Sequence, residues 1–465
     1  MSSLPRKFKI IKAAAVAGMS PRTGGKTCTL APDSLACSLW FAAQALVGVS
    51  GGKNLTEALA AIADALPAAR AAAQDIAYGV LRRYGWAEFL LARLLRTPLS
   101  HAGIEALLRA ALYRLETRPD ARHTVVDQAV QAAGELAGSP LKGLVNGVLR
   151  NYLRQRDTLL AAAACDEVAK NWHPRWWLQR LQRRWPAQWE SIVAADNAPP
   201  PMTLRANGRR GTAASYLARL QAAGLTARLL GKAGGSALRL ERPVPVDALP
   251  GFFEGEVSVQ DLGAQRAAEL LAPTAGMRVL DACAAPGGKT SHLLERADLD
   301  LLALDVDSAR AARITDNLRR LQLSAEVCVG DAAHPADWWD GRAFDAILAD
   351  VPCSASGVVR RHPDIKALRR ESDVRRFARE QAAILDALWP LLRPAGRLLY
   401  ATCSLFEEEN KGQVDAFLYR HADARQLAEE YWLPCPENDG FYYALLEKRH
   451  APENQGVQEG AREAG

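Results

Sequence analysis

Apolar residues recur at three- and four-residue spacing along the first third of the chain. This period is typical of amphipathic helices, and prolines and a glycine pair separate one helical stretch from the next. The pattern predicts helices over Leu35–Leu46, Leu55–Leu66, Ala69–Tyr84, Ala87–Leu95, Ile104–Leu115, Thr124–Ala137 and Leu141–Leu153. We therefore expect residues 34–160 to form a self-contained all-α bundle.

The pattern becomes mixed between residues 161 and 262. Short amphipathic helices rich in tryptophan are expected around Trp172–Trp189, and a triple proline at 199–201 then opens an extended segment at 202–207. A helix over Ala213–Ala223 follows, with short extended runs at Ala237–Leu240, Val244–Leu249 and 255–260. These features predict a small α+β subdomain that links the bundle to the rest of the chain.

Short apolar runs alternate with helical stretches from residue 263 to residue 450. Such alternation is typical of a doubly wound, Rossmann-like α/β domain. The predicted strands are Arg278–Ala282, Leu301–Asp305, Ala325–Val329, Ala346–Ala349 and Arg397–Ala401. The predicted helices between them lie near Lys289–Glu295, Ala309–Leu321 and Val374–Leu392.

Length and composition agree with several domains, because 465 residues are too many for one ordinary core. The formal net charge of +6 permits a polyanionic partner. Eight cysteines without a Cys-x-x-Cys pair argue against a disulfide framework and a zinc site, so we expect a reducing cytoplasm and no metal. No stretch has the length and apolarity of a membrane span. We expect the protein to be a monomer. The basic residues 1–33 and the polar residues 451–465 are expected to be disordered tails.

Residues 278–290 are predicted to form a strand, a tight turn and the start of a helix. Gly287 and Gly288 let the backbone approach a ligand, and the helix start offers unpaired N–H groups. The spacing matches neither the dinucleotide fingerprint nor the Walker loop, and it suits the methionine carboxylate of S-adenosylmethionine. Asp305 closes the next strand, where α/β sites place an acid on the ribose, and Asp331 follows the third strand, where a side chain can address the adenine.

Two cysteines follow predicted strands, Cys353 beside Asp350 and Pro352, and Cys403 at the end of the last strand. Because ligands gather at the carboxyl ends of parallel strands, two thiols there indicate chemistry rather than packing. A thiolate that adds to C6 of a pyrimidine turns C5 into a nucleophilic carbon. One thiol can therefore attack while the other helps to release the product, and a protonated Asp350 near N3 would favour the addition.

Four motifs carry a resemblance to a known family: Asp281–Thr290, Asp350-Val-Pro-Cys-Ser, Arg360-Arg-His-Pro-Asp and Tyr400-Ala-Thr-Cys-Ser. They resemble the RNA cytosine-C5 methyltransferases of the NOL1/NOP2/Sun family. The helical region, with Val125-Val-Asp-Gln-Ala-Val and Leu144-Val-Asn-Gly-Val-Leu-Arg-Asn, is similar to the NusB RNA-binding fold. This combination implies S-adenosylmethionine as cofactor and 16S rRNA, naked or in an early assembly intermediate, as partner.

The resemblance also implies roles for single residues. Cys403 would be the nucleophile and Cys353 would assist product release. Asp350 would lie near the target base as well as the cofactor, whose other contacts would be Cys283, Ala284, Ala285, Pro286, Gly287, Gly288, Lys289, Asp305 and Asp331. DNA cytosine methyltransferases instead attack with the thiol of the Pro-Cys motif, which would be Cys353, so only the presence of Cys403 separates the two assignments.

Arg360 and Arg361 follow the Pro-Cys motif and are predicted to contact RNA phosphates, since this stretch leaves the catalytic edge of the sheet. Two other functions remain open. One is a non-catalytic RNA-binding assembly factor of the NusB type, against which the intact cysteine pair and the cofactor acids speak. The other is a C5-cytosine methyltransferase that acts on tRNA or DNA.

Overall fold

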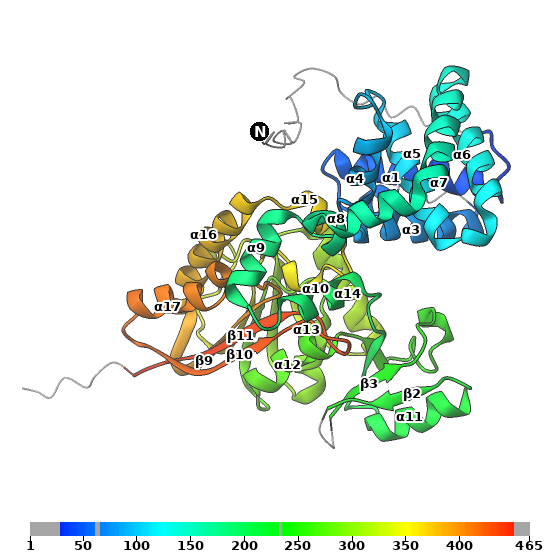
Figure 1. Cartoon of the computed structure of the whole chain (residues 1–465). Coiled ribbons are helices and arrows are strands. Elements are labelled where there is room, and N and C mark those ends of the chain that lie inside the picture. The colour runs from blue at the N-terminus through cyan, green and yellow to red at the C-terminus, as the bar shows by residue number, and fades with distance from the viewer. Residues whose placement is uncertain (1–27, 61–65, 232–234, 451–465) are drawn as a thin grey trace, which may run out of the picture.

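The computed structural model describes residues 28–60, 66–231 and 235–450. The predicted C-terminal tail, and residues 1–27 of the predicted N-terminal tail, lie outside these described residues. Four parts follow one another along the chain: a helical bundle, three connecting helices, a small four-stranded unit and a large seven-stranded unit (Figure 1). The predicted order of an all-α, an α+β and an α/β part is therefore confirmed.

The N-terminal bundle is built around the apolar helix α1, of whose 16 residues ten are buried. Ser34 caps this helix by accepting a hydrogen bond from the backbone N–H of Cys37. Helices α3, α5 and α6 pack around α1, and one continuous hydrophobic core joins them. The helices are α1 (Leu35–Ser50), α2 (Leu55–Ala60), α3 (Pro67–Arg82), α4 (Trp86–Leu94), α5 (Ala102–Thr117), α6 (Arg122–Ala137) and α7 (Lys142–Ala164).

Three short helices, α8 (Glu167–Asn171), α9 (Arg175–Arg184) and α10 (Trp189–Asn197), connect the bundle to the sheets. Their tryptophan-rich faces do not point to solvent. Trp177 is fully buried and packs in one core with Val359 and Phe406 from the C-terminal part of the chain. The connecting helices thus pack against segments that follow the carboxyl ends of strands in the large sheet.

The small unit is an antiparallel sheet in the order β2-β3-β1-β4, with α11 (Ala213–Ala222) packed against it. Its strands are β1 (Thr203–Ala206), β2 (Ala227–Leu229), β3 (Ala237–Leu240) and β4 (Val257–Val259). The predicted extended run Val244–Leu249 contains a 3-10 turn over Val246–Ala248 instead of a strand.

The large unit is a seven-stranded sheet in the order β10-β11-β9-β8-β5-β6-β7. Strands β5 to β9 run parallel, and β11 and β10 add an antiparallel edge. Helices α12, α13 and α14 bury one core on one face, and α16 and α17 bury another core on the opposite face. This three-layer arrangement confirms the Rossmann-like prediction.

The strands of this unit are β5 (Arg278–Ala282), β6 (Asp300–Asp305), β7 (Glu326–Val329), β8 (Phe344–Asp350), β9 (Leu392–Thr402), β10 (Ala424–Trp432) and β11 (Phe441–Lys448). The helices are α12 (Leu262–Leu271), α13 (Gly288–Arg296), α14 (Ser308–Leu321), α15 (Ile365–Leu368), α16 (Glu371–Leu388) and α17 (Lys411–Arg420). All five predicted strands are present, and β8 and β9 are longer than predicted. The pattern analysis missed β10 and β11.

Candidate active site at the carboxyl edge of the sheet

The two predicted catalytic thiols lie in contact. Cys353 follows β8 and Cys403 follows β9, and their Sγ atoms are 3.4 Å apart. The parallel pairing of β8 with β9 brings the two cysteines to the same sheet edge, although 50 residues separate them. Cys353 is 8% exposed, and its contact with Cys403 together with burial raises the pKa of its thiol well above the ordinary value. Cys353 is therefore held as a neutral thiol at pH 7.

A partly buried ion pair lies beside the thiols. The Nζ atom of Lys289, at the start of α13, is 2.6 Å from the Oδ2 atom of Asp350, at the end of β8. Burial disfavours the ammonium ion, but the Asp350 carboxylate and the Cys403 thiol raise the net pKa of Lys289. Asp350 is thus an acceptor in this structure. A protonated Asp350 near N3 of a bound base stays a prediction.

The turn after β5 has the shape that a close-fitting ligand site needs. Cys283 has φ +61°, and Gly287 has φ +92° with α14 so close that a Cβ atom there would lie 3.2 Å from the Cα atom of Ile314. Only glycine fits the second position without strain. Asp305, at the end of β6, accepts a hydrogen bond of 3.0 Å from the backbone N–H of Ala285 and so holds the turn. The predicted Cys283–Lys289 segment is thereby brought beside Asp305.

Two exposed valines flank the predicted adenine side of the site. Val306 follows β6 and is 66% exposed, and Val329 ends β7 and is 53% exposed, although large aliphatic side chains are usually buried. Strands β6 and β7 are paired at this level, with Asp305 opposite Val329. Asp331 lies just beyond, half-exposed, with its carboxylate accepting from the backbone N–H of Ala333.

These residues fit a carboxylate- and adenosine-bearing cofactor. Asp281 is fully buried at the end of β5, and its Oδ1 atom has no hydrogen-bond partner while Oδ2 accepts from Thr290 at 2.6 Å. An acceptor without a partner is costly inside a protein, so the ammonium group of an amino-acid ligand would satisfy it. Burial raises the pKa of Asp281 to about 7. The sequence analysis did not single out Asp281, whose signal is an acid inside an otherwise apolar strand.

The two predicted RNA-binding arginines lie elsewhere than expected. Arg360 is 1% exposed, its guanidinium paired with Asp439 and donating at 2.8 Å to the carbonyl of Cys435. No surface of it is open to a phosphate, so an RNA contact does not fit Arg360 in this structure. Arg361 also pairs with Asp439 and with Asp261, and its side chain is 26% exposed. An RNA contact by Arg361 stays a prediction.

The acids that pair with these arginines explain why the sequence predicted side chains that are free to contact RNA. Asp439 lies in the β10–β11 loop, 79 residues after Arg360, and Asp261 lies 100 residues before Arg361. Local sequence shows a basic run, whereas the acids that neutralise it come from distant segments. The two arginines therefore tie the Pro-Cys loop to the rest of the molecule.

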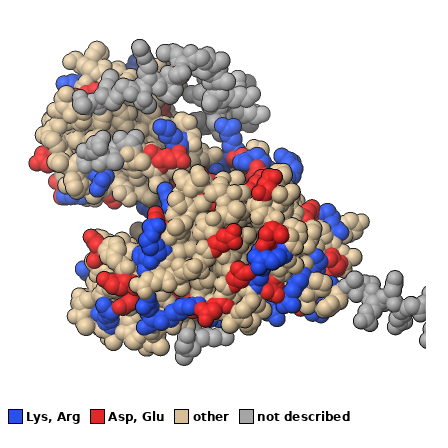
Figure 2. Space-filling model, turned by 180° about the vertical axis from the view of Figure 1, so that it is seen from behind, with Lys and Arg blue, Asp and Glu red and all other residues tan. Residues whose placement is uncertain are grey.

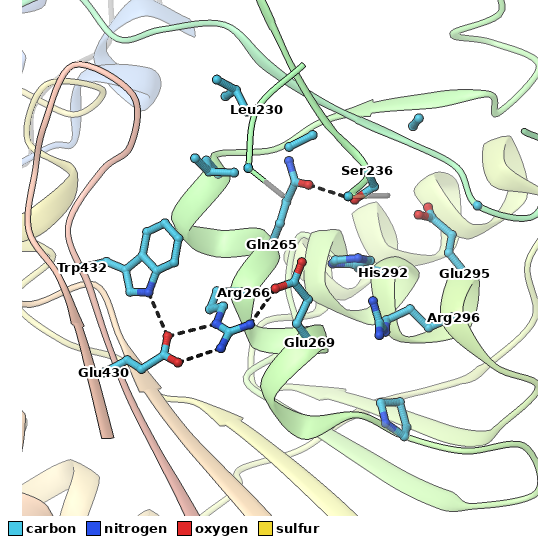
Figure 3. A pocket seen from close by; sticks show the side chains of 17 residues that line it. Leu230, Ser236, Gln265, Arg266, Glu269, His292, Glu295, Arg296, Glu430 and Trp432 are labelled. Carbon is cyan, nitrogen blue, oxygen red and sulfur yellow. Dashed lines mark hydrogen bonds and ion pairs between the residues drawn. The ribbon is translucent and has the colours of Figure 1, made fainter. Parts of the chain in front are cut away.

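A separate cavity of about 940 Å³ lies between the small sheet and the α12–α13 face of the large unit. Figure 3 shows Trp432 and the ion pairs of Arg266 with Glu269 and Glu430 on one side of it, and His292 and Arg296 on the other. None of the predicted catalytic or cofactor residues lines this cavity. Its volume alone therefore does not mark it as the reaction site.

The surface and the metal and membrane criteria add little. Basic and acidic side chains are interspersed on the face seen in Figure 2, so no single basic field marks an RNA path there. In residues 28–60, 66–231 and 235–450, no group of three or more His, Cys, Asp or Glu could hold a metal ion. No helix in those ranges is long and apolar enough to cross a membrane.

Three protein-family models match the chain, one for each major part. The model described as 16S rRNA methyltransferase RsmB/F matches residues 268–447. An RsmF/B-like ferredoxin-like domain matches residues 173–247, and the NusB family matches residues 40–154. The matched ranges follow the architecture observed here.

Curated relatives are similar along most of the chain. The ribosomal RNA small subunit methyltransferase B of Vibrio cholerae is 45% identical over 410 residues, which cover 86% of this chain and 94% of the relative. The protein of the same name from Erwinia tasmaniensis is 45% identical over 387 residues, which cover 81% and 90%.

Solved structures share the fold. The crystal structure of PH0851 has a TM-score of 0.75 at 22% identity and covers 91% of this chain and 100% of its own. A methyltransferase homolog protein from Pyrococcus horikoshii has a TM-score of 0.53 at 26% identity and covers 60% and 97%. At 18% identity, NSun6 from Pyrococcus horikoshii, solved with SFG, also has a TM-score of 0.53 and covers 60% and 99%.

Proposed function

We propose, since this chain belongs to the ribosomal RNA small subunit methyltransferase B family of S-adenosylmethionine-dependent rRNA methyltransferases, that it methylates C5 of a cytosine in 16S rRNA. The rRNA substrate is proposed from the family, and methylation at C5 is proposed from the two thiols. The observation that supports the C5 chemistry best is the 3.4 Å contact between Cys353 and Cys403 beside the Lys289–Asp350 pair.

The proposed reaction begins at Cys403. Its thiolate adds to C6 of the cytosine, and C5 becomes the nucleophilic carbon. The cofactor, when bound, supplies a methyl group on a sulfonium ion, and its transfer forms the C5–methyl bond. The C5 proton is then lost to water, the bond between Cys403 and C6 breaks with its electrons returning to the Cys403 sulfur, and the ring becomes aromatic again. The Cys353 thiol, 3.4 Å away, would assist by donating a hydrogen bond to the departing Cys403 thiolate.

The surrounding residues support these steps. Burial opposes the charge of Lys289, and its pKa is raised first by Asp350 and then by Cys403, so this cation lies close to that thiol. A cation in this position can pair with the negative charge that Cys403 carries when it attacks. The Lys289–Asp350 pair lies at the end of β8, where it can hydrogen-bond the polar edge of a cytosine. The cofactor would be held by the turn from Cys283 to Lys289, by Asp281, and by Asp305 and Asp331 at the ribose and adenine.

The order of the domains supports a proposal for how the chain binds its RNA substrate. The helical bundle at residues 34–160 would bind RNA or position the catalytic part, residues 161–262 would contact RNA, and residues 263–450 would carry out the transfer as a monomer. A cytosine must leave its stack to reach a thiol that is mostly buried, and naked or early-assembly 16S rRNA makes this less costly than a compact subunit.

The test is a covalent trap on 16S rRNA substituted with 5-fluorocytidine. Fluorine at C5 blocks the elimination, so the attacking thiol remains bound to the RNA. We expect an adduct with the wild type and with Cys353→Ala, and none with Cys403→Ala. An adduct lost only in Cys353→Ala would move the nucleophile to the Pro-Cys motif.

Two further measurements distinguish the proposed function from the alternative functions. Tight RNA binding without transfer of a labelled methyl group would favour the non-catalytic assembly factor. Competition by tRNA or DNA for the methyl group, at concentrations where 16S rRNA competes poorly, would favour the other substrate classes.

A further inference from the structure

A buried carboxylate links the two cysteine loops from behind. Glu409 lies in the short turn after β9 and is fully buried. Its Oε1 atom accepts a hydrogen bond of 2.7 Å from the backbone N–H of Ser354, and its Oε2 atom accepts one of 2.5 Å from the hydroxyl of Ser404. Ser354 directly follows Cys353, and Ser404 directly follows Cys403. One carboxylate therefore sets the positions of both cysteines.

Other buried groups hold this carboxylate in place. Gln381, on α16, lies 3.3 Å from its Oε1 atom and donates at 2.9 Å to the carbonyl of Pro352, the residue before Cys353. The hydroxyl of Tyr400 lies 2.7 Å from the Glu409 carbonyl. In the described part of the chain, no Lys or Arg forms an ion pair with Glu409, so hydrogen bonds alone stabilise it. Such a costly arrangement needs a reason beyond packing.

We propose that Glu409 is a positioning residue that holds the two thiols in register and makes Cys403, rather than Cys353, the nucleophile. This inference rests on the proposed C5 methyl transfer. The role of Glu409 goes beyond that reaction, because two thiols in contact do not by themselves determine which of them attacks.

The electrostatics around the thiols favour this assignment. The charge of Glu409 is one of the causes that raise the pKa of Cys353, after its contact with Cys403 and burial. The Lys289 ammonium interacts with the other thiol, Cys403. Negative charge that forms on Cys353 is therefore opposed by Glu409, whereas negative charge that forms on Cys403 during attack has a cation close to it. The other titratable groups that face the pair are Tyr400, Tyr443 and Asp350.

The test replaces Glu409 by its uncharged isostere, Glu409→Gln, and uses Glu408→Gln as the matched control. Glu408 is adjacent in sequence, half-exposed, and paired with Arg180 at 2.7 Å. Single-turnover methyl transfer and the 5-fluorocytidine trap are measured across pH 6 to 9, and the modified cysteine is identified by peptide mapping. We expect Glu409→Gln to lower the single-turnover rate by about 10²-fold, as a misplaced reacting group does, with unchanged cofactor affinity. Part of the trapped adduct should move to Cys353, and Glu408→Gln should behave as wild type.

The outcomes separate this inference from the proposed function. A wild type that forms no adduct on either cysteine overturns the proposed reaction and this inference with it. A wild-type adduct on Cys403 that is unchanged in rate, pH profile and position in Glu409→Gln overturns only the role of Glu409. If Glu409→Gln loses cofactor binding through misfolding, Ser404→Ala removes one link of the carboxylate instead. We expect it to slow transfer at least tenfold, and an unaffected rate there also overturns the role of Glu409.

Discussion

One buried arginine joins the small sheet to the start of α13, and its removal should loosen this contact. Arg205 lies on β1 and is fully buried. Its guanidinium forms a bidentate pair with Glu295 on α13, at 2.8 and 2.7 Å. Its other N–H groups reach the Gly288 carbonyl at 2.9 Å, the Ser291 hydroxyl at 3.0 Å and the side chain of Gln260. All five donors are thus satisfied by α13, the helix that follows the β5 turn, and by Gln260.

The substitution Arg205→Met removes this cation and leaves the Glu295 carboxylate, 3% exposed, without its charge partner. Breaking a buried pair in this way costs about 3–5 kcal/mol. Because about 1.4 kcal/mol corresponds to a factor of ten, opening of α13 should become at least about 100-fold more frequent. Hydrogen exchange of the α13 amides, followed by mass spectrometry, measures this local opening even though the chain has several domains.

Two control variants set a lower and an upper comparison for the expected loss of α13 protection. Arg209→Met removes a half-exposed guanidinium that also contacts α13 and pairs with the exposed Asp298, and should cost less than about 1 kcal/mol. The double variant Arg205→Met/Glu295→Met removes both charges and should recover most of the protection, because apolar groups can replace a buried pair at little cost. The reasoning is refuted if Arg205→Met changes α13 exchange less than about fivefold, or if the double variant is as labile as the single one.

Three further predictions concern the cofactor side, acid stability and the Pro-Cys loop. Asp305→Ala should weaken binding of S-adenosylhomocysteine at least tenfold by calorimetry, because the carboxylate holds the turn and faces the proposed ribose site. Although burial opposes its charge, hydrogen bonds from Arg156 lower the pKa of Glu116 below 4.5, so its stabilisation should be present above pH 4.5 and lost as pH falls through its folded-state pKa. In Glu116→Gln, the thermal midpoint of the bundle should therefore change less with pH between pH 6 and 3 than it does in the wild type. Asp439→Asn should lower the thermal midpoint, because it leaves Arg360 short of a buried charge partner.

Each of these has an outcome that contradicts it. Unchanged cofactor affinity in Asp305→Ala would show that backbone contacts alone hold the turn. An acid transition of Glu116→Gln that coincides with wild type would assign acid unfolding to other carboxylates. A wild-type thermal midpoint in Asp439→Asn would show that Asp261 alone neutralises both arginines of the loop.

The parallel strands were predictable and the antiparallel edge was not, for a reason of burial. Strands β5, β6 and β8 are covered on both faces, so each is a short, nearly continuous apolar run in the sequence. Strand β10 lies at the edge of the sheet and alternates exposed and half-buried residues, including Glu429 and Glu430. Its partner β11 has an apolar run that a buried helix could share, and its pairing with both β9 and β10 makes it a strand.

The sequence by itself determined the domain order, the glycine-containing turn after β5 and the two cysteines at strand ends, because these depend on local patterns and on the rule that parallel strands present their carboxyl ends together. The tertiary structure alone decided how charges are distributed around that chemistry. It brings Asp439 to Arg360, which buries a residue expected to meet RNA, and Glu409 to the serines behind both thiols. The physical reason is that the cost of a buried charge depends on partners supplied by distant segments, and no local pattern contains that information.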